Sequence, residues 1–564
     1  MAFKYRMFNA PSSYTLEDAV RLGCNWAIVH SAGIEAPATD PVSGRSTDMY
    51  PIYFEDYPKV AQIRHHEDAG WIEPLRRDVR ALSDRAVALG LKVAFHMYEP
   101  VLPHVFESEY PEIVSFWRRP TQQGVQYVHT LVDPDNSETW KLVRGKYAEL
   151  AREFPQASMF ILTTWDGTGT FWCVPQAKMS VAERLARMVQ AAQEGVDSVR
   201  PGVTIVFRLW GRNWPPEMYR DGHRLIAEAT GVANAAEIMQ PVSRAYNDPE
   251  KVLPDVLRRL PGNVPIMYKS TRIDIAEAQE LSLDVGKFPA SREQILEVSY
   301  EMYHVKRWPW CKVRHIRRGL DAARQHKLAG YLILPVNMGN DARHEDPESG
   351  NVGRMNTWLA GEILKNDGRD DARLVADWLK QEFGVEQPRE VVDILLGMDD
   401  LADRGVQWGA NVPNRLLFAS LHSTKLYWMF DGWANPAFPY RMAKPTRQVL
   451  EEMIGSKHQA HDDARLAIER LHACRAAMHE GLYDEMVQGL SFVADLILLC
   501  RDWHSYLLMQ YGLELGLWEP NRVNLGQLSR YAESFIKNLA RLKDAEAGKY
   551  AMQRLSFPDP FPLT

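Results

Sequence analysis

The chain has 564 residues, of which 46% are hydrophobic and 25% are charged, and it carries a formal net charge of -7. The charge is spread without a long run of one sign, which argues against a basic surface for nucleic acid. No segment reaches the roughly 18 uncharged apolar residues that span a bilayer, and the N-terminal residues lack the apolar core of a signal peptide. We therefore expect no nucleic-acid partner, no membrane contact and a cytoplasmic location.

The cysteines are few and scattered along the sequence. Their number is odd and no two form a Cys-x-x-Cys pair, so their spacing argues against both a disulfide framework and a zinc site. We expect a reducing compartment, no metal and no cofactor. The five residues are Cys24, Cys173, Cys311, Cys474 and Cys500.

The first 340 residues or so alternate short β-type runs with helical patterns. The eight runs that predict strands cover residues 4–10, 25–31, 92–100, 158–166, 203–211, 264–271, 294–303 and 330–339. Helical patterns lie between them, for example at 74–90, 137–154, 181–196 and 315–329. This order predicts a (β/α)₈ TIM barrel over residues 1–365. A doubly wound sheet is the alternative, but no Gly-x-Gly-x-x-Gly turn follows the first run. The run at 235–246 could add a ninth strand.

Residues 366–564 read differently. Helical patterns at 371–384, 388–405, 464–482 and 492–515 have no convincing strand between them, so we predict an all-helical C-terminal domain. An aromatic-rich loop at 426–440 interrupts it and is expected to cap the barrel mouth or to contact a second copy. A homodimer through this domain is our expectation.

Polar side chains follow the predicted strands where a barrel places its working residues, at the carboxyl ends. Three carboxylates arrive there, Asp166, Asp274 and Glu301, and two opposed carboxyl groups are what glycoside hydrolysis needs. Each could instead have a purely structural role: Asp166 could be a turn residue, Asp274 a helix cap, and Glu301 the ion-pair partner of a nearby basic residue. The other residues at these ends are His30, Ser31, His96, Tyr98, Glu99, Arg208, Trp210, Arg212, Lys269, Arg272, Asn337 and Asn340.

The histidines leave alternatives open. His30 and His96 could orient substrate hydroxyl groups or could be satisfied histidines at the rim of the core. His65 and His66 are adjacent, and adjacent side chains point in different directions, so a metal site there is disfavoured. No phosphate-binding glycine loop and no Gly-x-Ser-x-Gly elbow is present.

Several of these motifs, taken in order, resemble glycoside hydrolase family 67, the α-glucuronidases. The run DPDNSETWKLVRGKYAELAREFPQASMFILTTWDGTGTF resembles the family's fourth strand with its acid, and VPIMYKSTRID, ILEVSYEMY, GYLILPVNMGND and GRMNTWLAGEIL resemble its later barrel motifs. The resemblance is distant and covers roughly residues 80–440. It implies a barrel followed by a helical domain, and the family's N-terminal β-domain would be absent here.

The resemblance also implies roles for single residues. Asp166 falls where the family has its general acid, normally a glutamate, while Asp274 and Glu301 fall where the family holds and activates water in an inverting reaction. Lys269 and Arg208 match basic residues that bind the sugar carboxylate, which suits a uronate.

Two departures from the family pattern affect this reading. Leu162 stands where the family has a further lysine, which weakens the case for glucuronate. An aspartate in place of glutamate withdraws the acid by about 1.5 Å, one bond length, so the substrate sits deeper, the bond cleaved differs, or another residue such as Glu99 is the acid.

We therefore expect an exo-acting, inverting glycoside hydrolase that releases a terminal sugar, such as a uronic acid, from short oligosaccharides. Trp165 and Trp210 are candidate sugar platforms, and Asn337 is a further candidate contact. The alternatives are a metal-dependent barrel isomerase or lyase, and a sugar-binding paralogue without turnover.

Overall fold

The computed structural model describes residues 3–9, 16–32, 50–66, 68–103, 105–121, 124–163, 177–209, 249–270, 285–289, 291–299, 309, 311–334, 350–365, 368–405 and 446–544. The expected ninth run at 235–246 and the aromatic loop at 426–440 lie outside these ranges.

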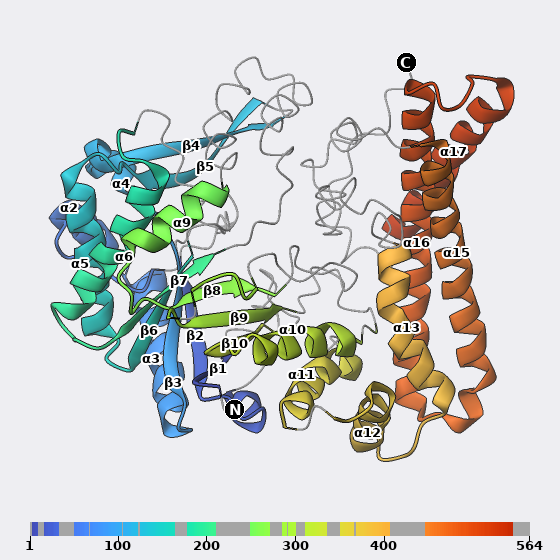
Figure 1. Cartoon of the computed structure of the whole chain (residues 1–564), viewed down its shortest axis with the longest axis horizontal. Helices are drawn as coiled ribbons and strands as arrows, with labels where there is room; N and C mark the ends of the chain where they lie inside the picture. Colours follow the sequence, from blue (N-terminus) through green and yellow to red (C-terminus); the bar gives the residue numbers. More distant parts are fainter. Residues whose placement is uncertain are drawn as a thin grey trace. The chain divides into compact units, whose positions relative to one another are not determined.

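Eight parallel strands close into a barrel, which confirms the predicted fold (Figure 1). Neighbours around the barrel follow chain order, and the last strand pairs with the first through Tyr5 and Gly330. The strands are β1 Tyr5–Asn9, β2 Trp26–Ala32, β3 Lys92–Tyr98, β6 Ala157–Thr163, β7 Thr204–Leu209, β8 Ile266–Lys269, β9 Gln294–Ser299 and β10 Gly330–Leu334.

Helices alternate with, and then follow, the barrel strands along the chain. They are α1 Leu16–Arg21, α2 Pro58–His66, α3 Glu73–Ala88, α4 Val105–Glu109, α5 Ser137–Glu153, α6 Val181–Asp197, α9 Pro249–Arg259, α10 Val313–Gln325 and α11 Gly350–Lys365. α3 packs against β2 and β3, and α6 packs against β7. Ser180 and Glu183 form a capping box that fixes where α6 begins.

An antiparallel hairpin between β3 and β6 was not predicted. Its strands β4 Val114–Thr121 and β5 Gly124–Val132 form a separate two-stranded sheet, so they leave the barrel count at eight.

The barrel interior holds an apolar layer to which all eight strands contribute. Its members are Tyr5, Met7, Trp26, Ile28, Ala94, Met159, Ile161, Val206, Met267, Ile295 and Leu332. Strand side chains alternate between two faces, so the intervening residues face the helices. Phe160, for example, packs edge-on against Tyr147 of α5.

The described part of the chain after the barrel is helical, as predicted. The helices are α12 Asp371–Phe383, α13 Arg389–Gly405, α15 Arg447–Ala473, α16 Glu480–Glu514 and α17 Arg522–Asp544. The single helix expected at 464–482 is wrong, because α15 ends at Ala473 and α16 starts at Glu480. The backbone of Met478 between them is extended, which breaks the helical pattern without a glycine or proline.

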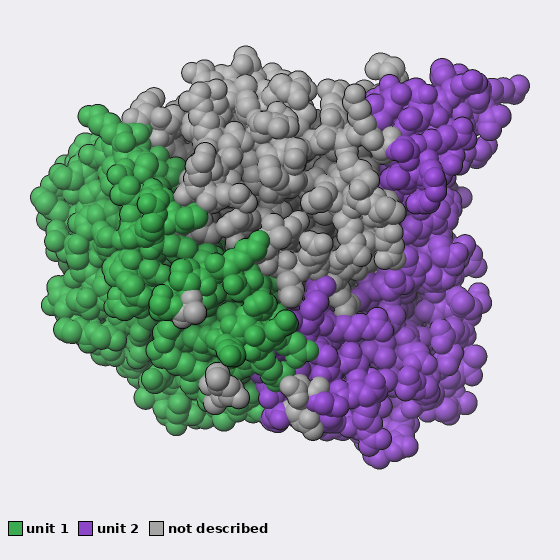
Figure 2. Space-filling view, viewed as in Figure 1, with its two compact units in different colours: residues 1–270, 282–298, 321–334 green, residues 271–281, 299–320, 335–564 purple. Residues whose placement is uncertain are grey.

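The chain forms two compact units (Figure 2). One comprises residues 1–270, 282–298 and 321–334, and the other comprises residues 271–281, 299–320 and 335–564. α11 lies within the range 1–365 that we expect for the barrel domain, and it falls in the second unit. In the described ranges, no helix has the length and apolar character needed to cross a membrane.

Candidate active site

The inner surface of the barrel changes from apolar to polar toward the carboxyl ends of its strands. Two residues beyond a member of the apolar layer, the side chain returns to the interior. Met7 is thus followed by Asn9, Val206 by Arg208 and Ile295 by Glu297. We call this set the polar layer: Asn9, Ser31, His96, Thr163, Arg208, Lys269 and Glu297. It lies at the end of the barrel where such folds carry their active sites.

A β-bulge decides which residue of β2 enters the polar layer. Ile28 pairs with Ala94, but the next pairs are His30 with Phe95 and Ser31 with His96, so one extra residue interrupts the register. Partners in a parallel ladder share a face, and Ser31 therefore joins His96 on the interior.

His30 is consequently separated from the predicted site residues. Its ring packs edge-on against Phe95 at 5.5 Å, and Phe95 in turn contacts Phe154 and Phe160 on the outer face of the barrel. Of the two readings that the sequence left open for His30, this position matches the core histidine.

The centre of the polar layer is a buried ion cluster. Arg208 Nε lies 2.6 Å from Glu297 Oε2, and its Nη2 lies 2.9 Å from Oε1, a bidentate pair. Lys269 Nζ lies 3.8 Å from the same Oε1, close enough for an ion pair but beyond hydrogen-bonding distance. All three residues are at most 2% exposed.

A hydrogen-bonded chain links this cluster to His96. Arg208 Nη1 donates to Thr163 Oγ1 at 3.3 Å, and Thr163 Oγ1 lies 2.5 Å from His96 Nε2. Burial holds the pKa of His96 well below its usual value, and the positive charges of Arg208 and Lys269 lower it further. His96 is therefore a neutral imidazole at physiological pH.

Cations outnumber carboxylates among the seven residues of the polar layer. Arg208 and Lys269 both face Glu297, and His96 is neutral.

The structure brings together three of the predicted site residues, Arg208, Lys269 and His96. Six others lie outside the described residues: Asp166, Asp274, Glu301, Trp165, Trp210 and Asn337. Their roles stay predictions.

Sequence reasoning missed Glu297 and Thr163 as members of the polar layer, and it named Ser31 at a strand end without giving it a role. Counting two positions from the apolar residues of each run would have found Glu297, an acid inside a buried strand.

Glu99, the alternative acid, points away from the polar layer. Its Oε1 lies 2.7 Å from Lys146 Nζ and accepts a hydrogen bond of 2.7 Å from the Tyr147 hydroxyl, both on α5. Lys146 also lies 4.0 Å from the ring centre of Tyr50. The carboxylate of Glu99 therefore binds α5, outside the polar layer.

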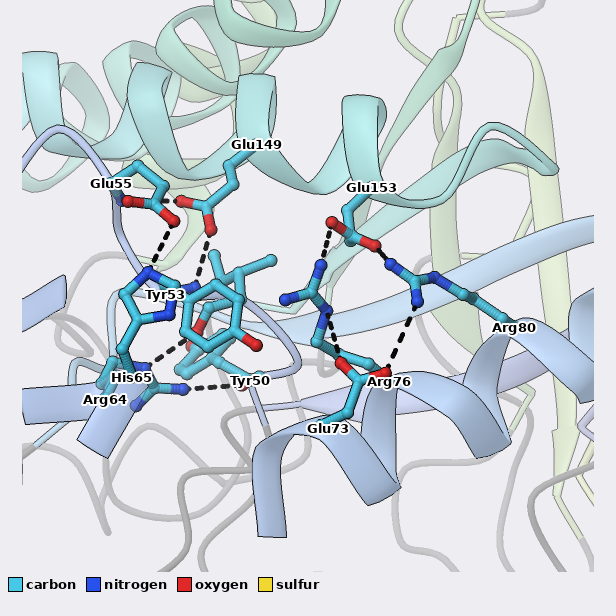
Figure 3. Close-up of polar contacts among 11 residues, drawn as sticks. Tyr50, Tyr53, Glu55, Arg64, His65, Glu73, Arg76, Arg80, Glu149 and Glu153 are labelled. Carbon is cyan, nitrogen blue, oxygen red and sulfur yellow. Dashed lines mark hydrogen bonds and ion pairs between the residues drawn. The ribbon is translucent and has the colours of Figure 1, made fainter. Parts of the chain in front are cut away.

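A second polar network fixes residues 50–57, the segment that leads into α2 (Figure 3). The carboxylate of Glu149 accepts hydrogen bonds from the backbone N–H groups of Tyr53 and Glu55, at 2.6 and 3.0 Å. Arg64 donates to the carbonyl oxygens of Tyr50 and Ile52.

Tyr50 joins this segment to the third barrel strand. Its hydroxyl lies 3.1 Å from the carbonyl oxygen of Tyr98 and 3.0 Å from that of Val101. Residues 50–57 are therefore tied both to α5 and to the carboxyl end of β3, beside His96.

Of the two adjacent histidines, His65 has contacts that the structure defines. His65 pairs with Glu55 at 3.0 Å and stacks on Tyr53. Nearby, Arg76 and Arg80 form ion pairs with Glu153, and Figure 3 shows both networks. Across the described residues, no three His, Cys, Asp or Glu side chains are grouped so as to hold a metal ion.

Comparison with known proteins gives a structural likeness only. No family model matches the chain, and no curated protein sequence does. The structure is similar to a glycoside hydrolase family 138 enzyme that targets the pectin rhamnogalacturonan II, with a TM-score of 0.55 and 12% identity over 99% of this chain and 80% of that one.

Two further solved structures are weaker matches. An O-GlcNAc hydrolase of Thermobaculum terrenum gives a TM-score of 0.41 at 11% identity over 98% of this chain and 94% of that one. A family 89 glycoside hydrolase of Clostridium perfringens, solved with GlcNAc-α-1,4-galactose, gives 0.47 at 9% over 96% and 54%. At 12% identity, the match to the family 138 enzyme supports the barrel fold and nothing finer.

Proposed function

We propose that the protein is a glycoside hydrolase that releases a terminal uronic acid from a short oligosaccharide. The observation that carries the proposal is the ion cluster of the polar layer, two cations held against one buried carboxylate at the carboxyl ends of β7, β8 and β9. Burying charge costs free energy, so such clusters are found more often at functional sites than as sources of stability.

The cluster suits a carboxylate ligand because its two cations are bound differently to Glu297. Glu297 engages Arg208 through both of its oxygens and so fixes the guanidinium in place. Lys269 has no hydrogen bond to Glu297 at its distance of 3.8 Å. A substrate carboxylate beside Lys269 Nζ would gain a charge-assisted hydrogen bond.

The motif resemblance supports this substrate class. The sequence motifs resemble the α-glucuronidases, whose substrates end in a uronic acid. The family 138 enzyme of similar fold targets the pectin rhamnogalacturonan II.

The proposed chemistry uses the carboxylates predicted from the sequence. Asp166 protonates the departing glycosidic oxygen, and Asp274 with Glu301 holds and activates the attacking water, which inverts the anomeric centre. Action on the chain end, an oligosaccharide substrate, a cytoplasmic location and a dimer through the C-terminal helices complete the proposal.

The test is a panel of aryl uronosides and matched neutral hexosides in both anomeric forms, with release of the aryl alcohol as readout. We expect hydrolysis of a uronoside, and we expect the Asp166→Asn and Glu301→Gln variants each to lower kcat by about 100-fold or more.

Each other outcome points to a different protein. Undiminished hydrolysis in both variants would exclude Asp166 and Glu301 as catalytic residues. Equal hydrolysis of the hexosides would exclude specificity for a uronate. Binding of a uronate without turnover would favour the sugar-binding paralogue. Turnover of a free sugar that requires a divalent cation would favour the isomerase or lyase.

A further inference from the structure

Ser31 has an unusual position for a serine inside a barrel. The bulge in β2 brings it into register with His96 on the neighbouring strand. Its Oγ atom is buried and makes no hydrogen bond within the described part of the chain. A buried hydroxyl without a partner is destabilising, and such a group in a native fold calls for a functional reason.

The hydrogen bonds of Thr163 favour one tautomer of His96. A guanidinium N–H can only donate, so Thr163 Oγ1 accepts from Arg208. The hydroxyl hydrogen of Thr163 can then point at His96 Nε2, which lies 2.5 Å from Oγ1. If Nε2 accepts, the proton of the neutral ring is on Nδ1.

The Nδ1–H group is then the remaining donor of the His96 ring, because the contact with Thr163 uses Nε2. It belongs to the residue registered with Ser31, and neighbouring strands lie about 4.8 Å apart. A single oxygen atom placed between the two side chains can reach both.

We propose that Ser31 and His96 together bind one hydroxyl group of the substrate sugar. The hydroxyl oxygen accepts from His96 Nδ1–H, and the hydroxyl hydrogen is donated to Ser31 Oγ. Thr163 and Arg208 act through His96 as positioning residues, because they hold its ring in the tautomer that donates from Nδ1.

The inference deepens the proposed function and rests on it for the identity of the ligand. A site built to hydrogen-bond a hydroxyl rejects an analogue that lacks it, since its own buried groups are then left unpaired. The pair therefore makes the site selective for a sugar that keeps this hydroxyl, independently of the cations that select the carboxylate.

The tautomer is tested first, on the full chain without substrate. Nitrogen-15 NMR of histidine-labelled protein, with His96→Asn to assign the signals, should show Nδ1 protonated and Nε2 unprotonated at pH 7.5. Thr163→Val should shift the ring toward Nε2–H, while Thr163→Ser, which keeps the hydroxyl, should retain Nδ1–H. A wild-type ring protonated on Nε2 would overturn the inference, whatever the protein hydrolyses.

The hydroxyl contact is tested with the best uronoside of the panel and its monodeoxy analogues. Ser31→Ala should lower kcat/KM for the uronoside by about 10-fold or more. One monodeoxy analogue should have a similarly lowered kcat/KM with the wild-type protein, and Ser31→Ala should not lower kcat/KM for that analogue any further. Additive losses for every analogue would overturn the inference while leaving the hydrolase assignment intact. If nothing is hydrolysed, the same comparison is made from dissociation constants of D-glucuronate and its deoxy analogues.

Discussion

Glu297 is the residue on which the geometry of the polar layer depends most. It is fully buried, it pairs bidentately with Arg208, and it also faces Lys269. The cations were predictable as polar residues at strand ends. Their partner lies 89 positions from Arg208 in sequence, so the pairing follows only from the closure of the barrel.

Replacing Glu297 by glutamine should therefore destabilise the fold strongly. Two buried cations would lose their counter-charge, and removing one partner of a buried pair costs about 3–5 kcal/mol of unfolding free energy. Urea denaturation followed by circular dichroism measures the change.

The matched control for this prediction is Glu138→Gln. Glu138 pairs with Lys141 at 2.6 Å with both side chains largely exposed, so its loss should cost at most about 1 kcal/mol. Similar losses in the two variants would show that the buried cluster contributes no more than a surface pair.

At the scale of elements, the ends of α2 and α5 hold the segment 50–57 in place. Glu149 accepts two backbone N–H groups of the segment, while Glu153, one turn further along α5, binds Arg76 and Arg80 instead. Burial raises the pKa of Glu149, which the two N–H groups oppose. Glu149 therefore holds the segment 50–57, and Glu153 holds α3.

Glu149→Gln should loosen the segment locally. An amide presents one acceptor oxygen where the carboxylate presents two, so one of the two backbone N–H groups loses its partner. Amide hydrogen exchange at Tyr53 or Glu55 should accelerate by about tenfold or more. Glu153→Gln should leave both amides unchanged, and an equal effect of the two variants would contradict the assigned contacts.

The long helix α16 gives the fold a dependence on pH. Burial, and to a smaller extent the charge of Lys457, hold the pKa of His504 well below its usual value. The unfolded chain protonates this histidine near pH 6.5 while the folded chain does not. Its contribution to stability is therefore complete above about pH 6.5 and is lost as the pH falls below that value.

His504→Gln should remove this part of the dependence. Between pH 6.5 and 5.5, the slope of unfolding free energy against pH should fall by up to about 1.4 kcal/mol per pH unit. Urea denaturation at a series of pH values measures the slope, and the difference at pH 8 reports the packing change alone. An unchanged slope would mean that His504 is protonated in the folded protein.

At the scale of the whole molecule, the fold was more predictable than the site. Eight apolar runs separated by helical patterns were sufficient for the barrel, since each strand is buried on both faces and reads as a short apolar segment. The hairpin β4–β5 was missed because its strands pair with each other and do not join the barrel. The turn between α15 and α16 was missed because no glycine or proline marks it.

The site was predictable only as far as strand ends could be read. Arg208, Lys269 and His96 were found in this way. His30 was expected beside them, but an extra residue in β2 shifts the alternation by one and places Ser31 there instead. A bulge depends on the register with neighbouring strands and leaves no mark in the sequence of the bulged strand alone.

The polar layer is proposed to select a sugar that carries a carboxylate. Isothermal titration of the full chain with D-glucuronate and D-glucose tests this proposal most directly, with Lys269→Met beside the exposed-site control Lys141→Met. We predict that glucuronate binds about 10- to 100-fold more tightly than glucose, that Lys269→Met removes this preference, and that Lys141→Met keeps it. Equal affinity of the wild-type protein for the two sugars would contradict the account.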